Sequence, residues 1–203
     1  MDSQGIRAWG REKKWTLTSP FVARCVKYVT AVSTCVFDES KGGVAMSEDR
    51  IEREITISAP IEEVWAVLTE PAHVGTWFGT GAPAEIDLRP GGVMVLDHGE
   101  HGTYPTLIVA VDPPRAFSYR WASAHPGVVA SEENSTLVEF TLDPTPDGTL
   151  LRLVESGFSN LVIPPGRERG AGFESHSAGW TEVVAKFAAY AEGTTQSPLL
   201  PSA

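Results

Sequence analysis

Residues 50–70 read RIEREITISAPIEEVWAVLTE, and within this stretch the spacing of the apolar residues changes in a way that decides the fold. Before Ser58, isoleucine occupies only odd-numbered positions, which predicts a strand with one buried face. After Pro60, apolar residues recur at intervals of three and four, and Glu62 and Glu63 stand in the first turn, where acidic side chains favour a helix. The stretch therefore predicts a strand followed directly by an amphipathic helix.

Downstream, the sequence predicts one more short helix and then only strands. Pro71 suits the first turn of that helix, and Gly79 predicts its end. Residues 84–157 consist of short apolar runs separated by turn residues, and residues 115–121 alternate between aromatic and other side chains. Consecutive hairpins without intervening helices predict an antiparallel meander.

The period changes again near the C-terminus, where residues 170–192 predict one long amphipathic helix that ends at Gly193. Its predicted apolar stripe consists of Phe173, Ser177, Trp180, Val184, Phe187 and Ala191. The whole pattern predicts an α+β domain in which two short helices follow the first strand and seven antiparallel strands precede a long helix.

Short motifs in this order resemble a known family. They are residues 59–65 (APIEEVW), 69–71 (TEP) leading to Trp77-Phe78, 112–115 (DPPR) leading to 117–121 (FSYRW), Gly157-Phe158 and Gly179-Trp180. The chain resembles the single-domain bacterial branch of the Hsp90 ATPase activator homologues, within the superfamily of START domains, Bet v 1-like proteins and polyketide cyclases (SRPBCC). The resemblance covers nearly all of residues 50–192.

The resemblance implies the helix-grip (Bet v 1-like) fold, in which a curved sheet wraps the C-terminal helix around a deep, mainly apolar cavity. Members of the superfamily use this cavity for lipids, sterols or polyketides, and some catalyse reactions there. Chaperone activation is not implied, because the eukaryotic co-chaperone resembles this chain only in its C-terminal domain.

The inward positions of the strands and the facing side of the long helix supply the candidate ligand-binding residues. These are Trp77, Phe117, Tyr119, Trp121, Glu155, His176, Trp180 and Val184. The aromatic residues at this spacing also suit an ordinary core, and the sequence leaves both interpretations open.

Glu155 and His176 are the polar members of this set. Strand alternation points Glu155 inward, where burial would raise its pKa toward a value useful for proton transfer, but a solvated position at the open end of the sheet is the alternative. His176 stands one turn before Trp180 and is expected to face either the cavity mouth or water. Spacing alone does not pair the two residues.

The run Asp97-His98-Gly99-Glu100-His101 contains two histidines and two acids, but its glycine-marked hairpin turn lacks the helical spacing that brings imidazoles together. No metal site and no cofactor are therefore expected.

The charge differs sharply between two parts of the chain. Residues 1–45 hold seven Lys and Arg against four Asp and Glu, and residues 46–203 hold nine against 22, so the formal charges are +3 and −13. The negative charge of residues 46–203, called the body below, disfavours binding of this part of the chain to nucleic acid or to anionic membranes. Both cysteines lie in residues 1–45, which excludes a disulfide-held core in the body.

These features predict a cytoplasmic protein with a helix-grip domain at residues 46–193 and a flexible tail at 194–203. Residues 1–45 are expected to be either translated leader upstream of a start at Met46 or a basic accessory arm.

The sequence favours binding of a small hydrophobic molecule, lipid or polyketide-like, over catalysis, because no complete catalytic constellation is recognisable. A cyclase or hydratase that uses Glu155 or His176 for proton transfer is the alternative. A chaperone-linked interaction module is the third possibility.

Overall fold

The computed structural model describes residues 49–195, so the predicted extension at 1–45 and residues 196–203 of the predicted tail lie outside the described residues. The strands are β1 Arg50–Ile57, β2 Glu85–Ile86, β3 Val93–Asp97, β4 Thr103–Asp112, β5 Ala116–Trp121, β6 Thr136–Thr145 and β7 Gly148–Ser156. The helices are α1 Ile61–Thr69, α2 Pro71–Phe78, α3 Glu168–Ala171 and α4 Phe173–Thr195, with short 3-10 turns η1 Gly99–His101 and η2 Phe158–Asn160. This order confirms the predicted α+β class.

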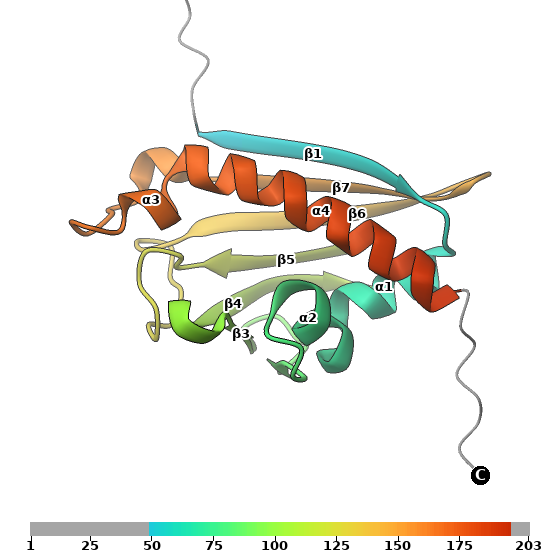
Figure 1. The fold of residues 1–203 in the computed structure, drawn as a ribbon, viewed down its shortest axis with the longest axis horizontal. Coiled ribbons are helices and arrows are strands. Elements are labelled where there is room, and N and C mark those ends of the chain that lie inside the picture. The colour runs from blue at the N-terminus through green and yellow to red at the C-terminus, as the bar shows by residue number, and fades with distance from the viewer. Residues whose placement is uncertain (1–48, 196–203) are drawn as a thin grey trace, which may run out of the picture. The chain divides into compact units, whose positions relative to one another are not determined.

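The seven strands form one curved antiparallel sheet in the order β1-β7-β6-β5-β4-β3-β2. Strands β2 to β7 are neighbours in sequence order, whereas β1 returns to pair with β7, where Ile51 lies opposite Glu155. Helix α4 crosses one face of the sheet from α3 at one end toward α1 and α2 at the other (Figure 1). The arrangement is the helix-grip fold predicted from the sequence.

The turn between β6 and β7 requires a glycine at position 148. Gly148 has a φ of +138°, which side chains other than glycine rarely adopt, and a Cβ at this position would lie 2.1 Å from the carbonyl oxygen of Ile57. The hairpin can therefore approach the end of β1 closely, which keeps β7 in register with both of its neighbours.

The long helix differs from the prediction at both ends. It begins at Phe173, after the separate turn α3, and it runs through Gly193 to Thr195. Gly193 therefore does not end the helix. An exposed glycine inside a helix costs only about 1 kcal/mol relative to alanine, so one glycine does not stop a helix that neighbouring residues hold against the sheet.

The core lies between the sheet and one stripe of α4. Trp180, Val184, Phe187, Ala188 and Ala191 are buried at the spacing of a single helix face. From the sheet, the buried residues include Ile51, Met94, Ile108, Phe117, Tyr119, Val138, Phe140, Leu142, Leu151 and Leu153. These side chains fill most of the space between helix and sheet.

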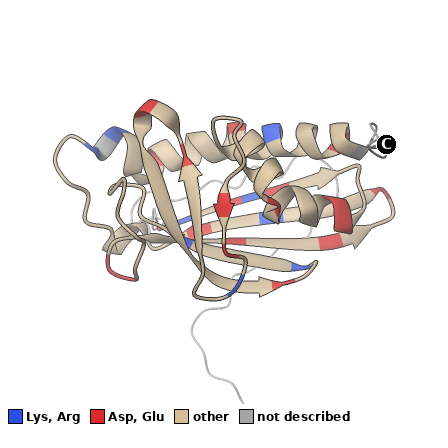
Figure 2. Ribbon diagram, turned by 90° about the horizontal axis from the view of Figure 1, so that it is seen from below, with Lys and Arg blue, Asp and Glu red and all other residues tan. Residues whose placement is uncertain are grey.

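Acidic residues outnumber basic residues in the domain. Asp and Glu predominate over Lys and Arg along the elements seen in Figure 2, as the composition of the body requires. Within residues 49–195, no helix has both the length and the hydropathy needed to cross a membrane.

Candidate functional site

The most deeply buried charged group is the Glu155 carboxyl, which is 0% exposed on β7 beneath α4. Thr136 Oγ1 donates a hydrogen bond to Oε1 at 2.6 Å, and Trp180 Nε1 donates to Oε2 at 2.5 Å. His176 Nδ1 lies 2.8 Å from Oε1 and 2.9 Å from Oε2. The carboxyl therefore has three partners from β6 and α4, which compensate for the loss of water around it.

This arrangement fixes the orientation of His176, which is only 5% exposed. When the carboxyl is ionised, Nδ1 of His176 must carry the proton that it donates to the carboxylate. The other ring nitrogen, Nε2, takes no part in this hydrogen bond. Nε2 is buried and has no hydrogen-bond partner among residues 49–195. A carboxylate that orients an imidazole with one unpaired nitrogen is the geometry of a general base.

Tyr119 is the third titratable group in this region. Burial, and secondarily the nearby charge of Glu155, raise the pKa of its phenol well above the ordinary value, so the phenol stays protonated. Its hydroxyl has no hydrogen-bond partner within the described part of the chain. The phenol is therefore neutral and, like His176 Nε2, incompletely paired.

A cavity of about 350 Å³ lies at the end of the sheet nearest α3. Three separate segments line it: the β3–β4 connection with the start of β4, the end of β5 with the following loop, and the loop into α3. The lining residues are His98, His101, Tyr104, Trp121, Ser123, Gly166, Arg167 and Gly170. We call this the end cavity. Its volume is within the range of about 300–1,000 Å³ that is typical of small-molecule sites.

Aromatic rings form one wall of the end cavity. The ring centroids of His98 and Tyr104 are 5.3 Å apart, and each lies 6.3 Å from that of Trp121. The Trp121 ring also packs against the His176 ring, with centroids 4.7 Å apart. Trp121 therefore connects the end cavity with the buried Glu155–His176 pair.

Unpaired polar atoms are concentrated at this cavity. Seven buried side-chain nitrogen or oxygen atoms in residues 49–195 have no hydrogen-bond partner, and three of them belong to the lining residues His98, Trp121 and Ser123. Ser123 is only 6% exposed. Native interiors leave few such atoms unpaired, so the presence of three of them in residues that line one cavity makes the end cavity the candidate site.

The three unpaired atoms differ in whether they can donate or accept a hydrogen bond. The Trp121 Nε1–H can only donate, while the Ser123 hydroxyl can donate or accept. Burial lowers the pKa of His98, His101 lowers it further, and Asp97 opposes the shift. His98 is thus neutral near pH 7, and its Nε2 donates or accepts according to the tautomer.

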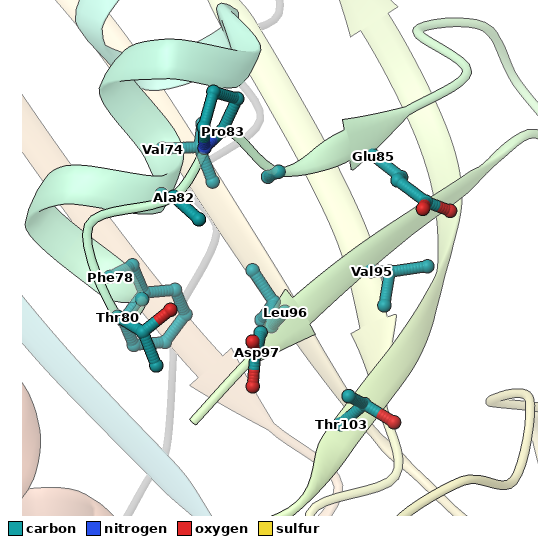
Figure 3. Close-up of a pocket in the computed structure, with 13 residues that line it drawn as sticks. Val74, Phe78, Thr80, Ala82, Pro83, Glu85, Val95, Leu96, Asp97 and Thr103 are labelled. Carbon is teal, nitrogen blue, oxygen red and sulfur yellow. The ribbon is translucent and has the colours of Figure 1, made fainter. Parts of the chain in front are cut away.

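Two neighbouring cavities have fewer residues with unpaired buried polar atoms in their lining. One of about 180 Å³ lies between α2 and β3 (Figure 3), where the carboxylates of Glu85 and Asp97 contribute to the lining. Another, of about 360 Å³, lies between α2 and α4 beside Trp77 and Lys186. Neither contains as many unpaired buried atoms as the end cavity.

The structure distributes the eight predicted ligand residues over different environments. Trp121 lines the end cavity, and Trp77 lines the cavity between α2 and α4, although its indole N–H already donates to the Val67 carbonyl. Glu155, His176 and Trp180 come together in one hydrogen-bonded group. Phe117, Tyr119 and Val184 are buried in the core. In the described part of the chain, these six residues line none of the three cavities above.

The inward position that strand alternation predicted for Glu155 is confirmed, and the expectation for His176 is corrected. Glu155 is not solvated at the open end of the sheet, because three donors allow its complete burial. His176 faces neither the cavity mouth nor water, because its ring is held between Trp121 and the carboxyl of Glu155. The two residues form the pair that spacing could not establish.

Sequence reasoning missed Tyr104, Ser123 and Arg167 as lining residues, and it considered His98 only as a metal ligand. The one available signal for this site was the presence of two polar, titratable side chains, His98 and His101, in a turn. No group of three or more metal-binding side chains is assembled anywhere in residues 49–195.

Comparison with known proteins assigns the domain. Residues 58–192 match the family model described as Activator of Hsp90 ATPase homolog 1-like protein. The chain belongs to this family. The matched range runs from the end of β1 to the end of α4, so family membership covers nearly the whole described domain.

Among curated proteins, this activator-homologue chain is similar to the uncharacterized protein C1711.08 of Schizosaccharomyces pombe, with 28% identity over 132 residues. The match covers 64% of this chain and 35% of the yeast protein, so the chain spans about a third of that relative's length. Its similarity therefore concerns one domain of a longer protein.

Among solved structures, the chain resembles protein MLL2253 of Mesorhizobium loti, with 27% identity, a TM-score of 0.57, and coverage of 71% of this chain and 98% of that one. It also resembles DynU16, which is encoded in the dynemicin biosynthetic locus, with 24% identity, a TM-score of 0.54, and coverage of 71% and 47%. The second likeness shows the fold alone. Both agree with the helix-grip fold of this family member.

Proposed function

We propose that the domain binds a small, mainly apolar molecule in the end cavity. The carrying observation is that three residues lining one cavity of about 350 Å³, His98, Trp121 and Ser123, each have a buried polar atom without a partner in residues 49–195. Aromatic rings supply apolar contact area, and a few fixed polar atoms supply orientation, which is the usual composition of a ligand site. The site lies at the end of the sheet rather than under the middle of α4, where side chains fill the interior.

A direct test fills the end cavity with a side chain. A Cβ on Gly170 would have no heavy atom within 4 Å, so Gly170→Trp places an indole in or beside the cavity without a backbone clash. Gly193→Trp is the matched control, because Gly193 is also helical and open but lies at the other end of α4. The probe is N-phenylnaphthylamine, a neutral dye that fluoresces in apolar surroundings.

We expect saturable binding of the dye to the full chain and to Gly193→Trp, and at least about tenfold weaker binding to Gly170→Trp, a loss on the order of 1.4 kcal/mol. Circular dichroism checks that both variants fold. Equal affinity for the two folded variants, or no saturable binding to the unmodified chain, contradicts the proposal.

A second candidate function is proton transfer by His176, because Glu155 orients its ring and leaves Nε2 free. In such a step Nε2 would take a proton from the substrate, and the resulting imidazolium would remain paired with the carboxylate. Binding ranks first because His176 is not among the residues that line the end cavity.

Nitrogen-15 NMR of His176 separates the two functions. A catalytic base must meet the bound molecule, so its Nε2 resonance should shift on addition of N-phenylnaphthylamine by more than that of Nδ1. A dye that saturates the site and leaves the Nε2 resonance unchanged contradicts the catalytic candidate and leaves the binding proposal intact.

A further inference from the structure

The lining of the end cavity has an unusual charge for this protein. The full chain has a formal charge of −10. None of the eight described lining residues is Asp or Glu, whereas Arg167 is a permanent cation and two are histidines. The cavity between α2 and β3, in contrast, has Glu85 and Asp97 in its wall. The permanent charge among the described lining residues is therefore positive, in contrast to the chain as a whole.

Two of the polar residues that line the end cavity can only donate hydrogen bonds. The indole N–H of Trp121 and the guanidinium of Arg167 have no acceptor capacity, and the hydroxyl of Ser123 can donate to a ligand oxygen. His101 is weakly engaged, since its Nε2 lies 4.0 Å from the exposed carboxylate of Glu100. A ligand group with two acceptor oxygens would satisfy Trp121 and Ser123 together beside the cation.

On the basis of the proposed function, we infer that the ligand is a carboxylic acid, bound as its anion, with the carboxylate beside Trp121, Ser123 and Arg167 and an apolar body against the aromatic wall. One exposed cation, Arg167, balances one negative charge. A phosphate monoester carries close to two negative charges near neutral pH, and the second would be left uncompensated within an acidic protein. A neutral alcohol would leave the guanidinium without a counter-charge.

The neutral state of His98 is consistent with this assignment. Burial holds the pKa of its imidazole below the ordinary value, so His98 adds no second positive charge above neutral pH. Its Nε2, protonated in one tautomer, can donate to a carboxylate oxygen at no cost in net charge. The site thus recognises a monoanion by hydrogen bonds and a single cation.

Three naphthalene derivatives that share one apolar body test the inference on the full chain: naphthoate, naphthylmethanol and naphthyl phosphate. Their affinities are measured above neutral pH by displacement of N-phenylnaphthylamine. We expect naphthoate to bind about threefold to tenfold more tightly than either of the others, the range given by a partly exposed charged hydrogen bond. An alcohol or a phosphate that binds as tightly as the carboxylate overturns the inference.

Matched variants locate the effect. Arg167→Gln should weaken the binding of naphthoate by about threefold to tenfold and leave the affinity for naphthylmethanol within about twofold. The control is Arg169→Gln, which removes the same charge from the same segment but outside the lining, and it should change neither affinity. Ser123→Ala should weaken naphthoate by about threefold, and Ser118→Ala, equally buried on the adjoining strand, should not. Equal effects within either pair overturn the inference.

The dye distinguishes the two levels of the argument. If N-phenylnaphthylamine binds and Gly170→Trp prevents it, but the carboxylate has no advantage, the cavity binds ligands and the carboxylate inference is wrong. If neither the dye nor any naphthalene derivative binds, the proposed function fails together with the inference.

Discussion

Two polar regions on either side of Trp121 differ in how their buried groups are paired. On the α4 side, the Glu155 carboxyl receives hydrogen bonds from three side chains and is 0% exposed. On the cavity side, Ser123 and the Trp121 N–H are buried without partners in the described chain. The hydrogen-bonded carboxyl joins α4 to the sheet, whereas the unpaired groups have no such role within the described chain and underlie the binding proposal.

The largest expected effect comes from breaking the satisfied side. Glu155→Leu removes the acceptor of three buried donors, so unfolding in urea should show a loss of about 3–5 kcal/mol. Glu139→Leu, an exposed position on the neighbouring strand, should stay within about 0.5 kcal/mol of the unmodified chain. Similar losses for the two variants would show that the network contributes nothing specific.

The next effect compares two tryptophans. Trp180→Phe removes an N–H that donates to Glu155, and we expect a loss of about 2 kcal/mol in the free energy of unfolding. Trp121→Phe removes an N–H without a partner and should cost less than about 1 kcal/mol, while weakening naphthoate binding. Urea unfolding and dye displacement measure both quantities, and the reverse order of stabilities would contradict the comparison.

A smaller effect compares two hydroxyls. Thr136→Val removes a donor to Glu155 at nearly constant volume and should destabilise by about 1–2 kcal/mol. Ser123→Ala removes a buried hydroxyl that has no partner, so its stability should be unchanged or raised by up to about 1 kcal/mol. Thermal unfolding of the two variants tests this, and a Ser123→Ala loss as large as that of Thr136→Val would place Ser123 among the satisfied groups.

The smallest effect concerns pH. The pKa of His98 is lowered in the folded state, mainly by burial, so the unfolded chain takes up a proton first as the pH falls below about 6.5. Stability should therefore be fully present above this value and decrease as the pH falls toward the folded pKa. His98→Gln should show a weaker dependence across that window in pH-resolved urea unfolding, and an unchanged slope would contradict the shift.

The family resemblance and the order of elements were accessible from sequence because both depend on local patterns, whereas the pairing of β1 with β7 does not. The change of period after Pro60 predicts the turn from β1 into α1, and the six later strands and α4 follow from alternation and helical spacing. Gly193 was misread because a single local signal was taken to end a helix that packing against the sheet prolongs.

The candidate site was accessible only in part. Trp121, Glu155 and His176 were identified individually, since alternation and helix spacing give the direction of each side chain. Their relationships were not, and Arg167 was missed because an arginine in a loop rich in proline and glycine carries no signal of its own. Which loop residues meet depends on the lengths and paths of three connections.

The sequence by itself determined the order of elements, the buried face of each, and an acidic body, because these depend on residues close together along the chain. Only the tertiary structure decided that Glu155 meets His176, 21 residues away, and that His98, Ser123 and Arg167 converge on one cavity. The physical reason is that strand register and the position of α4 on the sheet set distances between remote side chains, and no local period encodes those distances.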